Sequence, residues 1–201
     1  SAGIQPGLYE VRAAGRYGIS ASRLFAVGTL PELLESGAHD TPEKALLLTL
    51  PITVNGTTGT DAADYFRFAA SKGQRFLLSC AAERIDSPLN TVLTLFDPAG
   101  RELSTAHRTH SGDAIIELTA PQDGEFVVKI HDMVWQGGAD HVYRLTAAPV
   151  TVGADGEDPA LPLSGAVCDW MPQQPVTALK EAAPKATAAH QLVLPSVVAA
   201  A

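Results

Sequence analysis

The chain has 201 residues, which is enough for one domain of about 100–150 residues and some additional segments. A hydrophobic fraction of 46% permits a packed core, and an aromatic fraction of only 6% favours a core built mainly from aliphatic side chains. The formal net charge of −8, with scattered lysines and arginines, argues against nucleic acid as a partner, because binding phosphates requires a concentrated basic surface.

Residues 1–28 contain two alternating segments, 7–12 and 23–27, on either side of a turn-rich stretch at 15–18. A period of two predicts strands, and we interpret this pair as the last strands of a preceding immunoglobulin-like domain. An isolated hairpin is not stable in water, so this one must pack on the main domain or on a missing partner. The chain begins with Ser1 rather than Met and has no signal-peptide pattern, which favours excision from a longer protein.

Residues 29–40 are interpreted as a linker, and residues 41–148 have the pattern of an antiparallel β-sandwich. Thr41 and Pro42 are favourable residues at the start of a helix and predict one short helical turn. Short alternating segments then follow at spacings typical of an all-β domain. They predict strands near residues 46–54, 64–69, 75–82, 91–96, 115–118, 125–131 and 142–147.

The strand at 64–69 shows the alternation most clearly, because Phe66 and Phe68 share one face while Arg67 lies on the other. The strand at 125–131 has a core face made of Phe126, Val128 and Ile130. Turns are predicted where residues tolerate a positive φ or fix a bend, at Asn55-Gly56, Lys72-Gly73, residues 97–100 and Asp123-Gly124.

Residues 149–201 are rich in proline and alanine, a composition typical of a linker. The pattern around Glu181 and Leu194-Pro195 repeats that around Glu35 and Leu50-Pro51. Either a second repeat starts in this region, or the similarity arises by chance from common residues.

The chain has two cysteines. Cys80 alternates in phase with Phe76 and Leu78, so we interpret it as a small buried hydrophobic residue. A disulfide with Cys168 is the alternative, and the spacing does not decide between them.

A set of short segments occurs in a characteristic order and spacing: 40–45, 50–56, 61–68, 72–75, 84–89, 95–103, 120–128, 131–132 and 143–145. Through these segments, residues 31–147 resemble the bacterial pre-peptidase C-terminal domain of large secreted and surface proteins, of the type found in planctomycete-like bacteria. More distantly, they are similar to the collagen-binding domains of clostridial collagenases. The resemblance implies a jelly-roll-like β-sandwich, secretion, and an accessory or binding role without catalysis.

The resemblance also implies a calcium site, because some relatives hold this ion between the linker and the strand at 64–69. The ligands carried over are all acidic: Glu35, Asp40, Asp61 and Asp64. Gly37 and His39 stand where the pattern has a glutamate and an asparagine, and both changes remove oxygen ligands that calcium prefers. The alternative is that Asp61 and Asp64 only accept hydrogen bonds from a turn.

Catalytic patterns are weak in this sequence. His107, His110 and Asp113 lie in a polar segment without a zinc-protease spacing, and no Gly-x-Ser-x-Gly or phosphate-binding loop occurs. His131 and Asp132 are adjacent in a predicted strand and so point to opposite faces, which suits structural hydrogen bonds better than a catalytic pair. We therefore expect no enzymatic activity.

Met133 and Trp135 are the candidate binding residues, because they lie in a glycine-containing loop between two strands. They either present an exposed apolar contact for a sugar, a peptide or a neighbouring domain, or Trp135 folds back over the end of the sandwich.

Together these observations predict a non-catalytic β-sandwich module of a secreted or cell-surface multidomain protein, acting as a spacer, adhesion or binding domain. Its expected partners are neighbouring domains and an extracellular protein or polysaccharide. No segment reaches the about 18 consecutive apolar residues of a membrane span, so membrane insertion is not expected. The alternatives are a calcium-stabilised binding module and an accessory domain that assists the folding or secretion of an attached hydrolase.

Overall fold

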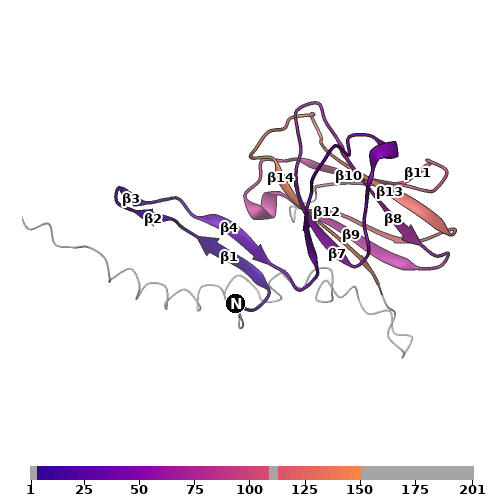
Figure 1. The fold of residues 1–201 in the computed structure, drawn as a ribbon, viewed down its shortest axis with the longest axis horizontal. Helices are drawn as coiled ribbons and strands as arrows, with labels where there is room; N and C mark the ends of the chain where they lie inside the picture. The colour runs from indigo at the N-terminus through magenta and orange to yellow at the C-terminus, as the bar shows by residue number, and fades with distance from the viewer. Residues whose placement is uncertain (1–3, 109–112, 151–201) are drawn as a thin grey trace, which may run out of the picture. The chain divides into compact units, whose positions relative to one another are not determined.

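The computed structural model describes residues 4–108 and 113–150. These residues form two five-stranded sheets packed as a β-sandwich, preceded by two small hairpins (Figure 1). Their only helical segments are two short 3₁₀ turns, η1 (Pro42–Lys44) and η2 (Glu83–Ile85). Within this part of the chain, no helix has the length and apolar character that a membrane crossing needs. The predictions of an all-β sandwich and of a helical turn after Thr41 are confirmed.

The first sheet has the order β11-β10-β13-β8-β6 and consists of β6 (Leu46–Leu47), β8 (Asp64–Ala70), β10 (Thr91–Phe96), β11 (Glu102–His107) and β13 (Gly124–Asp132). The second has the order β12-β9-β14-β7-β5 and consists of β5 (Glu32–Leu34), β7 (Ile52–Thr57), β9 (Arg75–Ala81), β12 (Asp113–Thr119) and β14 (Val142–Pro149).

Neighbouring strands are antiparallel except at one edge of each sheet, where β5 runs parallel to β7 and β6 runs parallel to β8. Both of these edge strands come from the segment 32–47, which precedes the other strands of the sandwich in the chain. The predicted linker 29–40 therefore contains a strand, β5, and β6 is the first part of the strand predicted at 46–54.

Aromatic rings occupy the centre of the core. Phe68, Phe76 and Phe126 are fully buried, and their ring centroids lie 5.0, 5.8 and 6.0 Å apart in pairs. Such pairs contribute about 0.5–1.5 kcal/mol each beyond the burial of their area. Aliphatic side chains such as Leu93 and Ile130 pack around them. These three rings thus form the centre of the core, where the two sheets meet.

The predicted core faces are confirmed in β8 and β13. Phe66 and Phe68 are fully buried while Arg67 between them is partly exposed, and alternate residues of β13, including Val128 and Ile130, are buried in the same way. Cys80 is fully buried, as predicted.

Three local predictions are wrong. The sequence did not indicate β11, because this edge strand is mostly polar and pairs only with β10. The single strand expected at 46–54 is divided between two sheets, since Pro51 has no N–H for a continuous ladder. Asn55 and Gly56 lie within β7 rather than in a turn. A Cβ atom at Gly56 would collide with the ring of Tyr143, so glycine permits a close approach there.

The N-terminal segment forms two small two-stranded pairs, β1 (Gly7–Val11) with β4 (Arg23–Val27) and β2 (Ala14–Gly15) with β3 (Gly18–Ile19). The N–H of Leu24 in β4 donates a hydrogen bond of 2.8 Å to the carboxylate of Asp86, beside η2. The origin of these strands in a preceding domain stays a prediction. Cys168 and the rest of the region 151–201, including the predicted second repeat, lie outside the described residues.

Candidate functional site

Three residues with metal-ligating side chains, Glu35, His39 and Asp64, converge beside the edge strand β5. Glu35 directly follows β5, and Asp64 is the first residue of β8. The N–H of Glu35 donates to the carbonyl of Asn55 at 3.0 Å, and the N–H of Tyr65 donates to the carbonyl of His39 at 2.8 Å. These backbone hydrogen bonds hold the segment 35–39 against strands of both sheets and so bring the three side chains together.

The hydroxyl of Tyr143 in β14 completes this group, which we call the Glu35 cluster (Glu35, His39, Asp64 and Tyr143). Nε2 of His39 lies 3.1 Å from Oε2 of Glu35 and 3.7 Å from Oδ1 of Asp64. The Tyr143 hydroxyl oxygen lies 2.5 Å from Oε2 of Glu35 and 3.0 Å from Oδ2 of Asp64. The side chains of Glu35, His39 and Asp64 are only 13%, 7% and 14% exposed, so water screens their interactions weakly.

Two ionisation equilibria of the cluster are shifted by this environment. Burial, together with the nearby charge of Glu35, raises the pKa of Asp64 to about 6, although the Tyr143 hydroxyl and His39 act in the opposite direction. Burial and the two neighbouring carboxylates raise the pKa of Tyr143 well above its usual range. Tyr143 is therefore a neutral hydrogen-bonding group at any physiological pH.

The four acidic residues carried over as calcium ligands do not gather at one point. Glu35 and Asp64 meet in the cluster, but Asp40 is exposed and its Oδ1 pairs with Nζ of Lys44 at 2.9 Å. Asp61 is also exposed, in a left-handed conformation with a φ of 52°, and its N–H donates to the carbonyl of Trp135. Across the described ranges 4–108 and 113–150, the one group of three such side chains close enough to share a metal is Glu35, His39 and Asp64.

This donor set does not fit calcium. Calcium takes about six to eight oxygen ligands, whereas the cluster offers two carboxylates and a phenol, with an imidazole nitrogen between the carboxylates. One oxygen of Glu35 is also used, because Oε1 accepts a hydrogen bond from the N–H of Thr57. A group of this composition can hold a metal ion, but one that accepts nitrogen as well as oxygen.

The second predicted site, Met133 and Trp135, follows β13. The indole of Trp135 stacks on the imidazole of His131, with ring centroids 4.4 Å apart and an angle of 16° between the planes. Nζ of Lys129 lies 5.0 Å from the centre of the same indole. Lys129 and His131 share the outer face of β13, since alternate residues of a strand point the same way. Trp135 therefore lies on the outside of the sheet.

The loop that carries Trp135 is fixed by one carboxylate. Asp132 accepts hydrogen bonds from the N–H groups of Asn90, Val134 and Gln136 at 2.9, 2.9 and 3.1 Å. Burial would raise the pKa of Asp132, but these donors outweigh it and hold the pKa below its usual value. Trp135 and Met133 remain 40% and 43% exposed on this fixed loop. Asp132 thus orders the loop, and its bonds are those of a structural residue.

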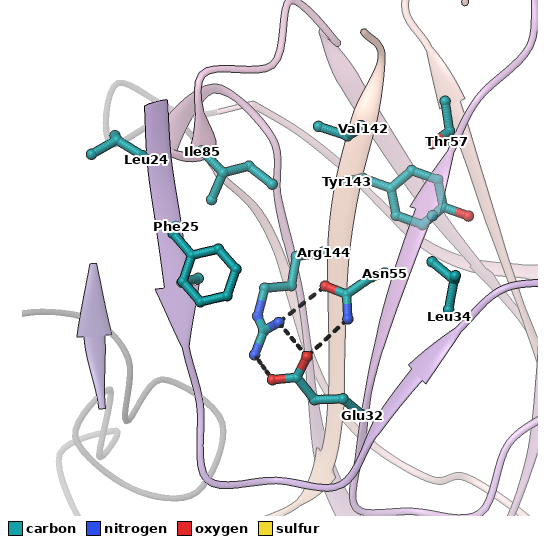
Figure 2. Close-up of a pocket in the computed structure, with 12 residues that line it drawn as sticks. Leu24, Phe25, Glu32, Leu34, Asn55, Thr57, Ile85, Val142, Tyr143 and Arg144 are labelled. Carbon is teal, nitrogen blue, oxygen red and sulfur yellow. Dashed lines mark hydrogen bonds and ion pairs between the residues drawn. The ribbon is translucent and has the colours of Figure 1, made fainter. Parts of the chain in front are cut away.

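A further pocket lies between β4 and the second sheet (Figure 2). Its wall carries Arg144, whose guanidinium donates two hydrogen bonds to the carboxylate of Glu32 at 2.7 and 3.0 Å and one to Oδ1 of Asn55 at 3.0 Å. Leu24 and Phe25 line the opposite side. The charged groups are thus paired within the protein and leave the pocket without a free charged side chain among its described lining residues.

Sequence reasoning missed two residues of the Glu35 cluster as functional groups. His39 was noted only as the replacement of an expected ligand, and Tyr143 only as part of a matching segment. Tyr143 is 108 residues from Glu35, so no local pattern could reveal the contact. The segment that contains His107 and Asp113 is interrupted by residues 109–112, so the expectation for His110 lies outside the described residues.

No family model and no curated protein matches the chain. Among solved structures, the pre-peptidase C-terminal domain of a collagenase from Bacillus anthracis superposes with a TM-score of 0.43 at 15% identity, covering 51% of this chain and 93% of that domain. PliG from Aeromonas hydrophila, a periplasmic inhibitor of g-type lysozyme, superposes with a TM-score of 0.41 at 12% identity, covering 62% of this chain and 100% of PliG. These similarities are too weak to carry a functional argument.

Proposed function

We propose that this chain is a non-catalytic binding module of a secreted or cell-surface multidomain protein, and that Trp135 contacts an extracellular polysaccharide. The observation that carries the proposal is the support of the indole ring. One face stacks on His131, which is itself on the outer face of β13, while 40% of the residue remains exposed. The exposed part of Trp135 is therefore available to a ligand.

The chemistry of this surface suits a sugar ring. A pyranose has an apolar face that can pack on an aromatic ring and hydroxyl groups at its edge that need hydrogen-bond partners. The ammonium of Lys129, which lies over the indole ring, supplies donors at this surface. The Asp132 hydrogen bonds fix the loop before binding, which reduces the entropy that a ligand must overcome.

Exposed apolar side chains on the N-terminal hairpins support the multidomain part of the proposal. Tyr17 and Phe25 are strongly exposed there, and the same segment exposes Tyr9, Val11 and Ile19. An apolar surface of this kind is typical of a contact with another domain. The accessory role beside a hydrolase stays a prediction of the sequence resemblance.

The test is co-sedimentation of the chain with insoluble cellulose, chitin and peptidoglycan. We expect retention on at least one of them, and a loss of affinity of about tenfold or more in Trp135→Ala. Tyr17→Ala is the matched control, because it removes an exposed aromatic ring far along the chain from the loop, and it should bind as the wild type does. Thermal unfolding verifies that both variants are folded. The proposal is contradicted if no polysaccharide retains the wild type, or if Trp135→Ala is retained equally well.

A further inference from the structure

The Glu35 cluster contains more hydrogen-bond acceptors than donors. Nδ1 of His39 lies 3.1 Å from the carbonyl oxygen of Gly37, which can only accept, so Nδ1 carries the proton. In the neutral imidazole, Nε2 then presents its lone pair to the carboxylate oxygens of Glu35 and Asp64 at 3.1 and 3.7 Å. Tyr143 has a single proton and lies within hydrogen-bond distance of both carboxylates.

Neighbouring arginine and lysine side chains are already paired with other groups; Arg67, three residues after Asp64, pairs with Glu125. Arg144 follows Tyr143 in β14, but its guanidinium is bound to Glu32 and Asn55. Lys44 is paired with Asp40 on the exposed side of the segment. With His39 neutral, this buried set of acceptors has no counter-charge, which is costly, and a cation at its centre removes the cost.

We propose that the Glu35 cluster binds one divalent metal ion of the zinc class, with Nε2 of His39 and the carboxylates of Glu35 and Asp64 as ligands. The replacement of the expected asparagine by His39 thus changes a calcium pattern into a site for a metal that accepts nitrogen.

The two spacings measured from His39 agree with this assignment, and all three ligand atoms lie within 4.8 Å of one another. Zinc binds nitrogen and oxygen at about 2.0–2.1 Å, so two ligands of a tetrahedral site lie about 3.3 Å apart. The distances from Nε2 of His39 to the two carboxylates, 3.1 and 3.7 Å, lie on either side of this value. The two carboxylates also balance the charge of a divalent ion.

The surrounding groups orient the ligands as in known metal sites. Metal-binding histidines usually donate their other ring N–H to a carbonyl or carboxylate, and Nδ1 of His39 meets the Gly37 carbonyl in this way. The carboxylate of Glu35 is held by the N–H of Thr57 and by the Tyr143 hydroxyl. Ligands fixed in this manner lose little freedom when the ion binds.

The first experiment is thermal unfolding of the full chain after treatment with a chelator, at pH 7.5, with no metal, with zinc and with calcium. A metal that binds only the folded chain raises its melting temperature by mass action. We expect a rise of roughly 5–10 °C with zinc at about a hundred times its dissociation constant, and no rise with calcium. Competition with a coloured zinc chelator should show one zinc ion bound per wild-type chain and none bound to His39→Asn.

His39→Asn is the decisive variant, since it removes the nitrogen ligand and restores the residue of the calcium pattern. The zinc-dependent shift should disappear in His39→Asn and persist in His107→Asn, a control that removes an exposed histidine outside the cluster. If His39→Asn does not fold, NMR of the wild type decides: the Nε2 resonance of His39 should move on addition of one equivalent of zinc.

Three outcomes overturn the proposal. Zinc could leave the melting temperature unchanged, or the shift could persist in His39→Asn, or the Nε2 resonance could fail to move.

Discussion

The ion pair between Glu32 and Arg144 should contribute measurably to stability, because one partner is almost completely buried. The Arg144 side chain is 4% exposed, and both oxygens of the Glu32 carboxylate accept its hydrogen bonds. Removing one partner of a buried pair costs about 3–5 kcal/mol. Glu32 is 41% exposed, so water can replace part of the interaction, and Asn55 still binds the guanidinium. For Glu32→Gln we expect the free energy of unfolding to fall by about 2 kcal/mol.

The assay is urea-induced unfolding followed by far-UV circular dichroism at pH 7, with the midpoint and slope fitted separately. Glu125→Gln is the matched control, because Glu125 forms a pair with Arg67 in which both side chains are 41–52% exposed. Such a surface pair is worth only about 0.2–1 kcal/mol. A double-mutant cycle with Arg144→Met then isolates the coupling between Glu32 and Arg144, which we expect to be about 1–2 kcal/mol.

The same pair should make stability depend on pH in the acid range. The hydrogen bond from Arg144 holds the pKa of Glu32 below its usual value of 4.5, although burial opposes this. The stabilisation is therefore present above about pH 4.5 and is lost as the pH falls through the lower pKa of the folded state. The difference in the free energy of unfolding between the wild type and Glu32→Gln should therefore become smaller below pH 4.5. Two results would refute this reasoning. Glu32→Gln could lose no more free energy of unfolding than Glu125→Gln, or its difference from the wild type could stay constant as the pH falls below 4.5.

Three further predictions concern the interior and one turn. Phe126→Ala removes a fully buried ring from the aromatic centre of the core. In urea unfolding, it should lower the free energy of unfolding by about 3–5 kcal/mol, and a loss below about 1 kcal/mol would mean that the core repacks freely. Asp97→Asn replaces a carboxylate that accepts hydrogen bonds from Ala99 and Arg101 with a neutral amide. The free energy of unfolding should fall by about 1–2 kcal/mol in the same assay, whereas no loss would show that the turn does not need the negative charge. In a Cys168→Ser background, Cys80 should react with a coloured thiol reagent only as fast as the protein unfolds, because it is fully buried; rapid labelling under native conditions would contradict its burial.

Much of the sandwich was predictable, because the inner residues of its central strands alternate with outer ones. Phe66 and Phe68 in β8, and Val128 in β13, show the period of two that a half-buried strand requires. Edge strands were harder to recognise. β11 has a mostly polar composition, and β5 is only three residues long, so neither presents an apolar pattern that can be recognised without its partner strand.

The Glu35 cluster was only half predictable. The sequence resemblance indicated Glu35 and Asp64, and the structure brings them together. It also indicated Asp40, which a neighbouring lysine four residues later holds on the exposed side. Tyr143 enters through the pairing of β14 with β7, and His39 through a backbone contact with β8. Contacts set by strand pairing across the whole domain have no local signature in a single sequence.

The parallel strands β5 and β6 have a consequence for association between molecules. One short segment, residues 32–47, covers the edge of β7 in one sheet and the edge of β8 in the other. If it detaches, two unpaired backbone edges become available at once, and such edges pair readily with strands of other chains. The same segment from a second molecule fits both edges, so its detachment at high protein concentration would lead to a domain-swapped dimer. Any cation that fastens Glu35 and His39 to the sheets would then also keep the protein monomeric.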